Sequence, residues 1–97
     1  MRKLTAQDII NIIGTETHGY KIFGAGIKKG PHTDSDHYGI VLGQNKTGNY
    51  VTWQFHLDDE EPNYYWGHYL SDDREAAIRD FNERGADLQE ATETEAM

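Results

Sequence analysis

The chain has 97 residues, of which 36% are hydrophobic and 11% aromatic, and it contains no cysteine. This length suits one hydrophobic core and therefore one domain, and the lack of cysteine excludes disulfides and thiolate zinc sites. No run approaches the roughly 20 apolar residues of a membrane span, so we expect a cytoplasmic protein that binds no membrane.

The charge is distributed unevenly along the chain. Residues 1–48 carry six Lys or Arg against four Asp or Glu, whereas residues 49–97 carry three against thirteen. The acidic second half repels the phosphates of nucleic acid and attracts a basic partner. The competing interpretation is an acidic surface that only keeps the protein in solution.

The first predicted element is a short helix that begins after Thr5. The Thr5 hydroxyl is placed to accept from the amide of Asp8, and Asp8 suits the positive first turn of a helix. Ile9 and Ile12 follow helical spacing and form an apolar stripe, and Gly14 favours the left-handed end of the helix. The pattern predicts about two turns, which need tertiary packing to persist.

Four β-rich runs follow, separated by residues typical of turns, at positions 20–27, 37–43, 50–57 and 64–70. Runs in this succession predict a four-stranded antiparallel meander. We expect Gly43 to face Tyr50 and Leu57 to face Tyr64. This register predicts one nearly apolar face, which carries Tyr38, Ile40, Leu42, Val51, Trp53, Phe55, Leu57, Tyr64, Trp66, His68 and Leu70.

The last predicted helix begins at Ser71 or Asp72, with Glu75 three residues after Asp72 as in a capping box. Gly85 is expected to end it. Residues 86–97 are small, polar and acidic, and we expect them to form a flexible tail.

These elements predict an α+β fold with the order αββββα and a single domain over residues 1–85. Both helices are expected to pack on the sheet face that carries Trp53, Phe55 and Trp66, which gives two layers.

One loop crowds together two imidazoles and two carboxylates, from His32, Asp34, Asp36 and His37. Divalent metals use such ligands, but the spacing matches no closed zinc pattern, and local hydrogen bonding in a turn is the favoured interpretation. No metal ligand is assigned and no cofactor is expected. A small metal-binding module or metal-assisted enzyme built on this loop is the alternative function.

Two further histidines, His56 and His68, are candidates for acid–base chemistry. The predicted register puts His56 and His68 on opposite faces of the sheet, so they do not share a site, and no serine or cysteine nucleophile has a recognisable partner. We therefore expect a protein without enzymatic activity. The second sheet face carries Tyr50, Tyr65 and Tyr69 and resembles a stacking platform for single-stranded nucleic acid, but it lacks Lys and Arg. Direct nucleic-acid binding is thus a further alternative, and a protein-binding surface is favoured over it.

The acidic run at residues 58–61 and the acids at the start of the last helix are the most distinctive feature. Gathered at one end of a rigid domain, they would imitate the phosphate spacing of nucleic acid and occupy a basic groove of another protein. The predicted partner-binding residues are Asp58, Asp59, Glu60, Glu61, Asp72, Asp73 and Glu75, with Tyr65 and Tyr69 as aromatic anchors.

Three segments, YVTWQF at residues 50–55, YYWGHY at 64–69 and DFNER at 80–84, resemble small accessory proteins of bacterial conjugative elements and phages. Some short acidic members of that group are anti-CRISPR inhibitors. The resemblance implies a non-enzymatic, protein-binding protein of a mobile element. In its specific form, this is an anti-defence inhibitor that blocks the nucleic-acid-binding groove of a bacterial defence protein. The resemblance assigns no role to any single residue.

Overall fold

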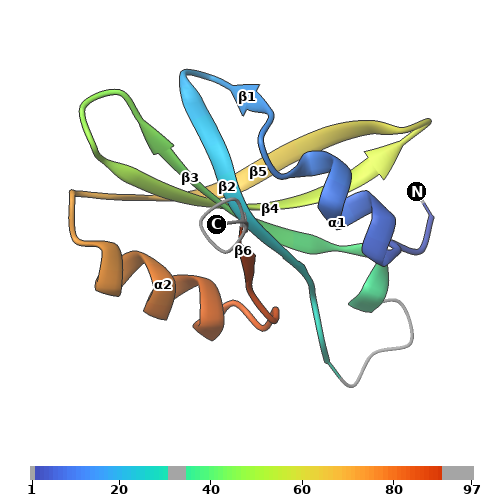
Figure 1. The fold of residues 1–97 in the computed structure, drawn as a ribbon. Coiled ribbons are helices and arrows are strands. Elements are labelled where there is room, and N and C mark those ends of the chain that lie inside the picture. The colour runs from blue at the N-terminus through green and yellow to red at the C-terminus, as the bar shows by residue number, and fades with distance from the viewer. Residues whose placement is uncertain (1, 31–34, 91–97) are drawn as a thin grey trace, which may run out of the picture.

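The computed structural model describes residues 2–30 and 35–90, and it has an antiparallel sheet with two α-helices (Figure 1). The elements are α1 (Ala6–Ile12), β1 (Glu16–Thr17), β2 (Tyr20–Ile27), the 3-10 helix η1 (Ser35–His37), β3 (Gly39–Asn45), β4 (Tyr50–Asp58), β5 (Glu61–Leu70), α2 (Arg74–Glu83) and β6 (Gln89–Glu90). Strands β1 to β5 are neighbours in chain order, and β6 pairs with β2. The α+β class is confirmed, but the sheet has six strands in place of the four predicted.

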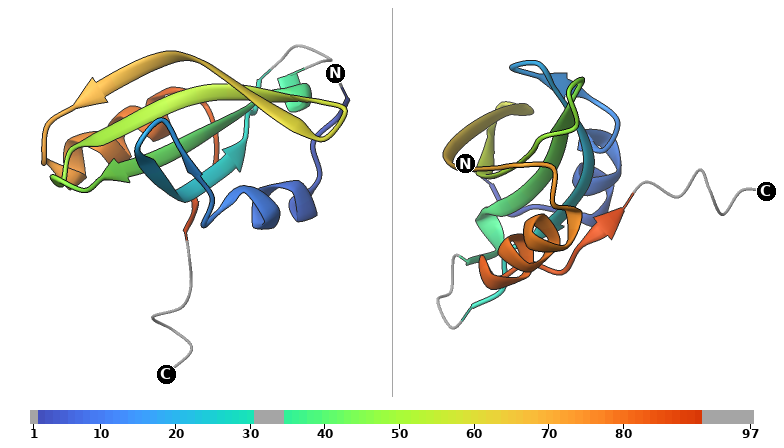
Figure 2. Two further views of the ribbon diagram at one scale, coloured as in Figure 1. Left: turned by 90° about the horizontal axis from the view of Figure 1, so that it is seen from above. Right: turned by 90° about the vertical axis from the view of Figure 1, so that its left-hand side faces the viewer.

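The sheet is curled, so that β5 returns towards the start of β2 (Figure 2). Ring centroids of Tyr20 in β2 and Tyr69 in β5 lie 6.3 Å apart, and Trp53 of β4 lies 5.5 Å from Tyr20. The first and last long strands are therefore joined by aromatic contacts across the concave side. Among the described residues, neither helix has the length and apolar run that crossing a bilayer requires.

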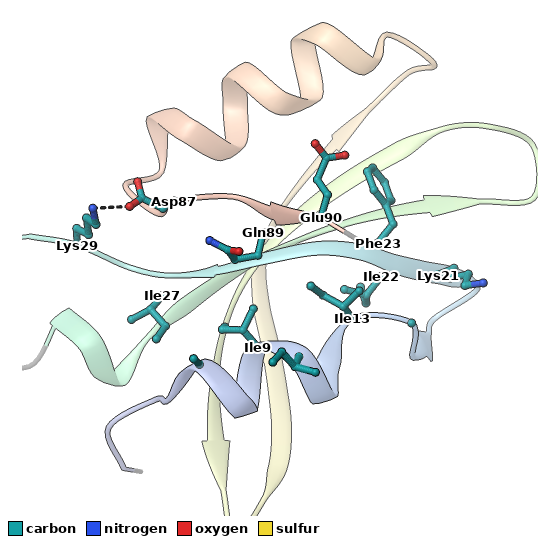
Figure 3. A pocket seen from close by; sticks show the side chains of 13 residues that line it. Ile9, Ile13, Lys21, Ile22, Phe23, Ile27, Lys29, Asp87, Gln89 and Glu90 are labelled. Atoms are coloured by element: carbon teal, nitrogen blue, oxygen red, sulfur yellow. Dashed lines mark ion pairs between the residues drawn. The ribbon is translucent and has the colours of Figure 1, made fainter. Parts of the chain in front are cut away.

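The helices cover opposite faces of the sheet. Along β3, Val41 belongs to the hydrophobic cluster of α1, whereas its neighbours Ile40 and Leu42 belong to the cluster of α2. Successive side chains of a strand point to opposite faces, so these two clusters lie on the two sides of the sheet. Figure 3 shows the same for β2, with Ile22 on the side of α1 and Phe23 on the side of α2. The prediction that both helices cover one face is wrong.

The cause is a one-residue difference in the pairing of β3 with β4. Gly43 pairs with Val51 rather than with Tyr50. A slip of one residue moves every side chain of a strand to the other face. Ile40 and Leu42 thus lie on the side of α2, away from Trp53, which is 4% exposed as expected for the core.

A β-bulge changes the faces of the second half of β5. Gln54 pairs with Tyr65 and Thr52 with His68, so two residues of β5 oppose the single residue Trp53 of β4. Trp66 lies in this bulge with a left-handed φ of 53°. The extra residue shifts the alternation of side chains, and the Trp66 indole is 68% exposed, contrary to the prediction that it is buried.

The helix ends follow the capping rules. Thr5 caps α1 through the amide of Asp8, as predicted, and the Asp8 carboxylate also accepts from the Thr5 amide, which completes a capping box. The cap of α2 is Asp73, whose carboxylate accepts from the amide of Ala76, rather than Ser71 or Asp72. Gly85, with a φ of 91°, follows α2 and ends it as predicted.

The domain extends beyond residue 85. Ala86 is buried and Leu88 packs on the cluster of α2, while β6 pairs with Gly24 and Ala25 of β2. Residues 86–90 are therefore part of the fold rather than of a tail. Residues 91–97 lie outside the described residues.

Asp8 makes folding sensitive to acid. Arg2 donates to both carboxylate oxygens, with Nη1 at 2.7 Å from Oδ2 and Nη2 at 2.8 Å from Oδ1, and the Thr5 amide donates at 2.8 Å. These bonds hold the pKa of Asp8 well below its ordinary range. Because the folded-state pKa is depressed, the stabilisation is complete above the unfolded value of about 3.9 and is lost as the pH falls below it.

We expect Asp8→Asn to reduce the pH dependence of stability in acid, because Asn keeps an acceptor but has no charge to protonate. Thermal unfolding followed by circular dichroism between about pH 6 and about pH 3 measures this. The wild type should lose more of its melting temperature over this interval than the variant. Parallel losses in the two proteins would show that other carboxylates control acid unfolding.

Candidate functional site

The acidic run forms a tight hairpin turn rather than a loop. Asp58 of β4 pairs with Glu61 of β5, and Asp59 and Glu60 between them have left-handed φ values of 51° and 70°. Two left-handed residues define a type I′ turn, which favours Asn-Gly. A residue with a side chain costs roughly 1–2 kcal/mol in this conformation, so the turn keeps its acids at the expense of stability.

A chain of contacts leads from this turn to Trp66. His56 Nε2 lies 3.0 Å from Asp58 Oδ2, and His56 Nδ1 lies 3.0 Å from the Tyr65 hydroxyl. A neutral imidazole satisfies both bonds, donating from Nε2 and accepting at Nδ1. The hydrogen bond from His56 lowers the pKa of Asp58. The Tyr65 ring then meets the Trp66 ring edge to face, with centroids 5.1 Å apart and planes at 87°.

We call His56, Tyr65 and Trp66 the aromatic ridge. Trp66 combines an exposed indole, which gains no stabilisation from burial, with a left-handed backbone, which raises the free energy of the folded chain. Tyr65 was predicted to bind a partner, but sequence reasoning missed Trp66. Regular alternation along β5 places Trp66 with Tyr64 in the core. The sequence signal that could have indicated the bulge is Gly67, which opposes Trp53 together with Trp66.

The predicted acids do not gather at one end. Residues 58–61 lie at the start of β5, whereas Asp72, Asp73 and Glu75 follow its far end. Ten residues of extended strand separate the two groups by about 30 Å. Asp73 also serves as the cap of α2. The site therefore contains the acids of the hairpin turn and not those of α2.

Tyr65 and Tyr69 are likewise separated. Tyr65 contacts His56, whereas the Tyr69 hydroxyl accepts from Trp53 Nε1 at 3.2 Å on the opposite face. In a regular strand, residues four apart share a face, and the bulge at Trp66 breaks this relation. The predicted tyrosine platform, to which Tyr50 was also assigned, does not form, because Tyr50 is buried under α2.

His56 and His68 lie on the same face, contrary to the prediction, because the bulge turns His68 towards α2. His68 Nδ1 lies 3.0 Å from both carboxylate oxygens of Asp80. Asp80 Oδ2 also accepts from the buried Thr52 hydroxyl at 2.6 Å, and Arg84 donates to that hydroxyl at 3.1 Å. Each histidine thus has its own carboxylate partner, and the Asp80 network ties α2 to the sheet.

The chain matches no protein-family model, no curated protein and no solved structure in the comparisons made. The geometry of the residues therefore carries the functional argument.

The predicted metal loop lies only partly within the described residues. His32 and Asp34 are outside them. Asp36 pairs with Lys3 Nζ at 3.3 Å and lies 3.5 Å from His37 Nδ1. Within residues 2–30 and 35–90, no three His, Asp or Glu side chains are grouped to hold a metal ion.

An apolar cavity of about 950 Å³ lies between α1, β2 and β6 (Figure 3). Its walls include Ile9, Ile13, Ile22 and Phe23. The charged groups at its rim include an ion pair between Lys29 and Asp87 and the carboxylate of Glu90, which binds Arg74 of α2 at 2.6 Å. The cavity offers apolar contact rather than a reactive group.

Proposed function

We propose that this chain is a non-enzymatic binding protein that engages a basic surface of another protein through its β4–β5 hairpin. The aromatic ridge supplies the anchor and the acids at residues 58–61 supply the charge. The observation that carries the proposal is Trp66, an exposed indole in a strained bulge. Tryptophan is enriched among the residues that contribute most to protein–protein binding.

The contacts of the ridge favour a preorganised anchor. Trp66 packs against Tyr65, Tyr65 bonds to His56, and His56 bonds to Asp58. An anchor that is already ordered loses little side-chain entropy on binding, which increases affinity.

The charge of the hairpin favours a basic partner of the kind that binds nucleic acid. Four consecutive acids lie at one turn, and the exposed indole of Trp66, further along the same hairpin, can stack on a guanidinium. In its specific form, the proposal is an inhibitor from a mobile element that occupies the nucleic-acid-binding groove of a bacterial defence protein.

Substitution of Trp66 or of the turn charge should remove partner capture. We expect the wild-type chain, immobilised in a bacterial lysate, to retain a basic protein that Trp66→Ala and Asp59→Lys each fail to retain. Added double-stranded DNA should release this protein from the wild type, because both compete for one groove. Quantitative mass spectrometry of the retained proteins measures the effect.

Asp72→Lys is the matched control, since it makes the same charge change at an exposed position beyond the other end of β5. It should leave capture intact. Retention that is unchanged in Trp66→Ala, or lost equally in Asp59→Lys and Asp72→Lys, would refute a site on the hairpin.

A further inference from the structure

The apolar cavity between α1 and β6 is elongated along β2. Lys21 and Lys29 both line it, and Figure 3 shows them at its two ends. An extended chain from residue 21 to residue 29 spans about 26 Å. The cavity volume of about 950 Å³ lies within the range of small-molecule sites. The cavity therefore suits a long, narrow apolar group.

The charges along most of this cavity are already paired. Lys29 pairs with Asp87, and the carboxylate of Glu90 binds Arg74 of α2 at 2.6 Å. Within the part of the chain that the structure describes, the ammonium group of Lys21 makes no ion pair. The cavity thus carries one uncompensated charge, which is a cation, in a chain whose net charge is −8.

A polar hollow continues the cavity beyond this lysine. Lys21 and Phe23 line both spaces, and residues 44–47 at the β3–β4 turn complete the hollow. Lys46 of this turn likewise makes no ion pair within residues 2–30 and 35–90. Among the described residues, Glu16 supplies the one carboxylate of the lining. Two ammonium groups therefore outnumber one carboxylate, and the hollow attracts anions.

Part of the apolar wall of the cavity contacts solvent. Ile10 of α1 is 63% exposed, and Ile13 and Phe23 are partly exposed. Covering such surface with an apolar group is favourable, because it removes that surface from water. A long alkyl chain matches this wall, and an anionic head group matches the two lysines of the adjoining hollow. A cationic amphiphile matches the wall alone.

We propose that the cavity binds a long-chain carboxylate, whose alkyl chain lies along β2 and whose carboxylate lies in the polar hollow between Lys21 and Lys46. Charge-assisted hydrogen bonds from the two ammonium groups hold the head group. The site goes beyond the proposed function, because none of its residues belongs to the β4–β5 hairpin. A ligand that contacts α1, β2 and β6 together binds only the folded chain and raises its melting temperature.

Titration of dodecanoate into the full chain, below the concentration at which it forms micelles, tests the site by calorimetry and amide chemical shifts. We expect the shifts to change at residues 9–14, 21–23 and 44–47. Each pair of methylenes added between octanoate and dodecanoate should tighten binding about ten-fold. Lys21→Gln should weaken binding about five-fold. Arg79→Gln removes the same charge from an exposed position of α2 that lines neither space, and should change affinity less than about two-fold.

A second pair of ligands and variants tests the head group and the wall separately. Dodecyltrimethylammonium has the same tail and the opposite charge, and it should not produce these shift changes. Ile10→Glu places a carboxylate on the wall at an exposed position, so the chain should still fold but lose dodecanoate binding. Gln7→Glu adds the same charge elsewhere on the exposed surface of α1 and should change affinity less than about two-fold.

Absence of saturable binding, equal weakening by Lys21→Gln and Arg79→Gln, or the same shift changes with the cationic amphiphile would overturn the site. A dimer in sedimentation that Ile10→Glu dissociates would instead assign the apolar wall to a second copy of the chain. Trp66→Ala separates this site from the proposed function, since it should abolish protein capture but leave dodecanoate affinity unchanged.

Discussion

Replacing Asp59 with Asn and Glu60 with Gly is expected to raise the free energy of unfolding by about 1.5 kcal/mol. Both positions have left-handed backbone, which glycine adopts without strain and asparagine tolerates. The change removes the ion pair of Glu60 with Arg2, but that carboxylate is 72% exposed and such pairs contribute about 0–1 kcal/mol. The stabilisation from relief of backbone strain is therefore larger than the stabilisation lost with the ion pair.

Denaturant unfolding, supported by a melting temperature about 6–12 °C higher, measures this gain. Asp59→Asn alone is the control and should gain only a few tenths of a kcal/mol. The double variant should also capture less partner, because it removes two of the four turn acids. A variant less stable than the wild type would mean that the acids stabilise the turn and are not retained for binding.

Asp80→Ala is expected to lower the free energy of unfolding by about 3 kcal/mol. The Thr52 hydroxyl is fully buried and donates to Asp80, so alanine leaves this donor without an acceptor. Burial lowers the pKa of Arg84 while Asp80 raises it, so removal of the carboxylate also leaves a half-buried cation uncompensated. His68 loses its partner as well, although it is half exposed and its loss adds little.

Thermal and urea unfolding measure the effect of Asp80→Ala. Glu83→Ala removes the same charge from an exposed position of α2 and should change stability by no more than about 0.5 kcal/mol. Asp80→Asn retains an acceptor for Thr52 and should fall between the two. If Asp80→Ala behaved like Glu83→Ala, the network would be only a surface contact.

Local signals in the sequence predicted the elements well. The cap at Thr5, the glycine after α2 and the buried Phe81 of α2 all follow from side chains that act within a few residues. The strands β2 and β4 follow from β-rich runs bounded by turn residues. The strands β1 and β6 have two residues each, which is too short for any alternation to be visible.

The same local signals do not predict which side chains share a face of the sheet. Pairing Gly43 with Tyr50 or with Val51 differs by one residue, and both choices give apolar neighbours, so the sequence does not decide between them. The left-handed residue of the bulge is Trp66 rather than a glycine, which would have indicated a left-handed position. For this reason Trp66, His68 and Tyr69 were each assigned to the wrong face, and the ridge that carries the proposed function was not foreseen.

Strand β5 is the last in the sheet order, so one side of its ten residues has no neighbouring strand among the residues that the structure describes. The unpaired N–H and C=O groups of such an edge strand can pair with further chains and cause aggregation. Pro62 has no amide hydrogen to donate to an added strand, and the charge of Glu61 repels a second copy of the chain. The bulge at Trp66 interrupts the regular edge of the strand. The protein thus presents Trp66, the side chain proposed to bind a partner, on an edge strand that resists fibre growth.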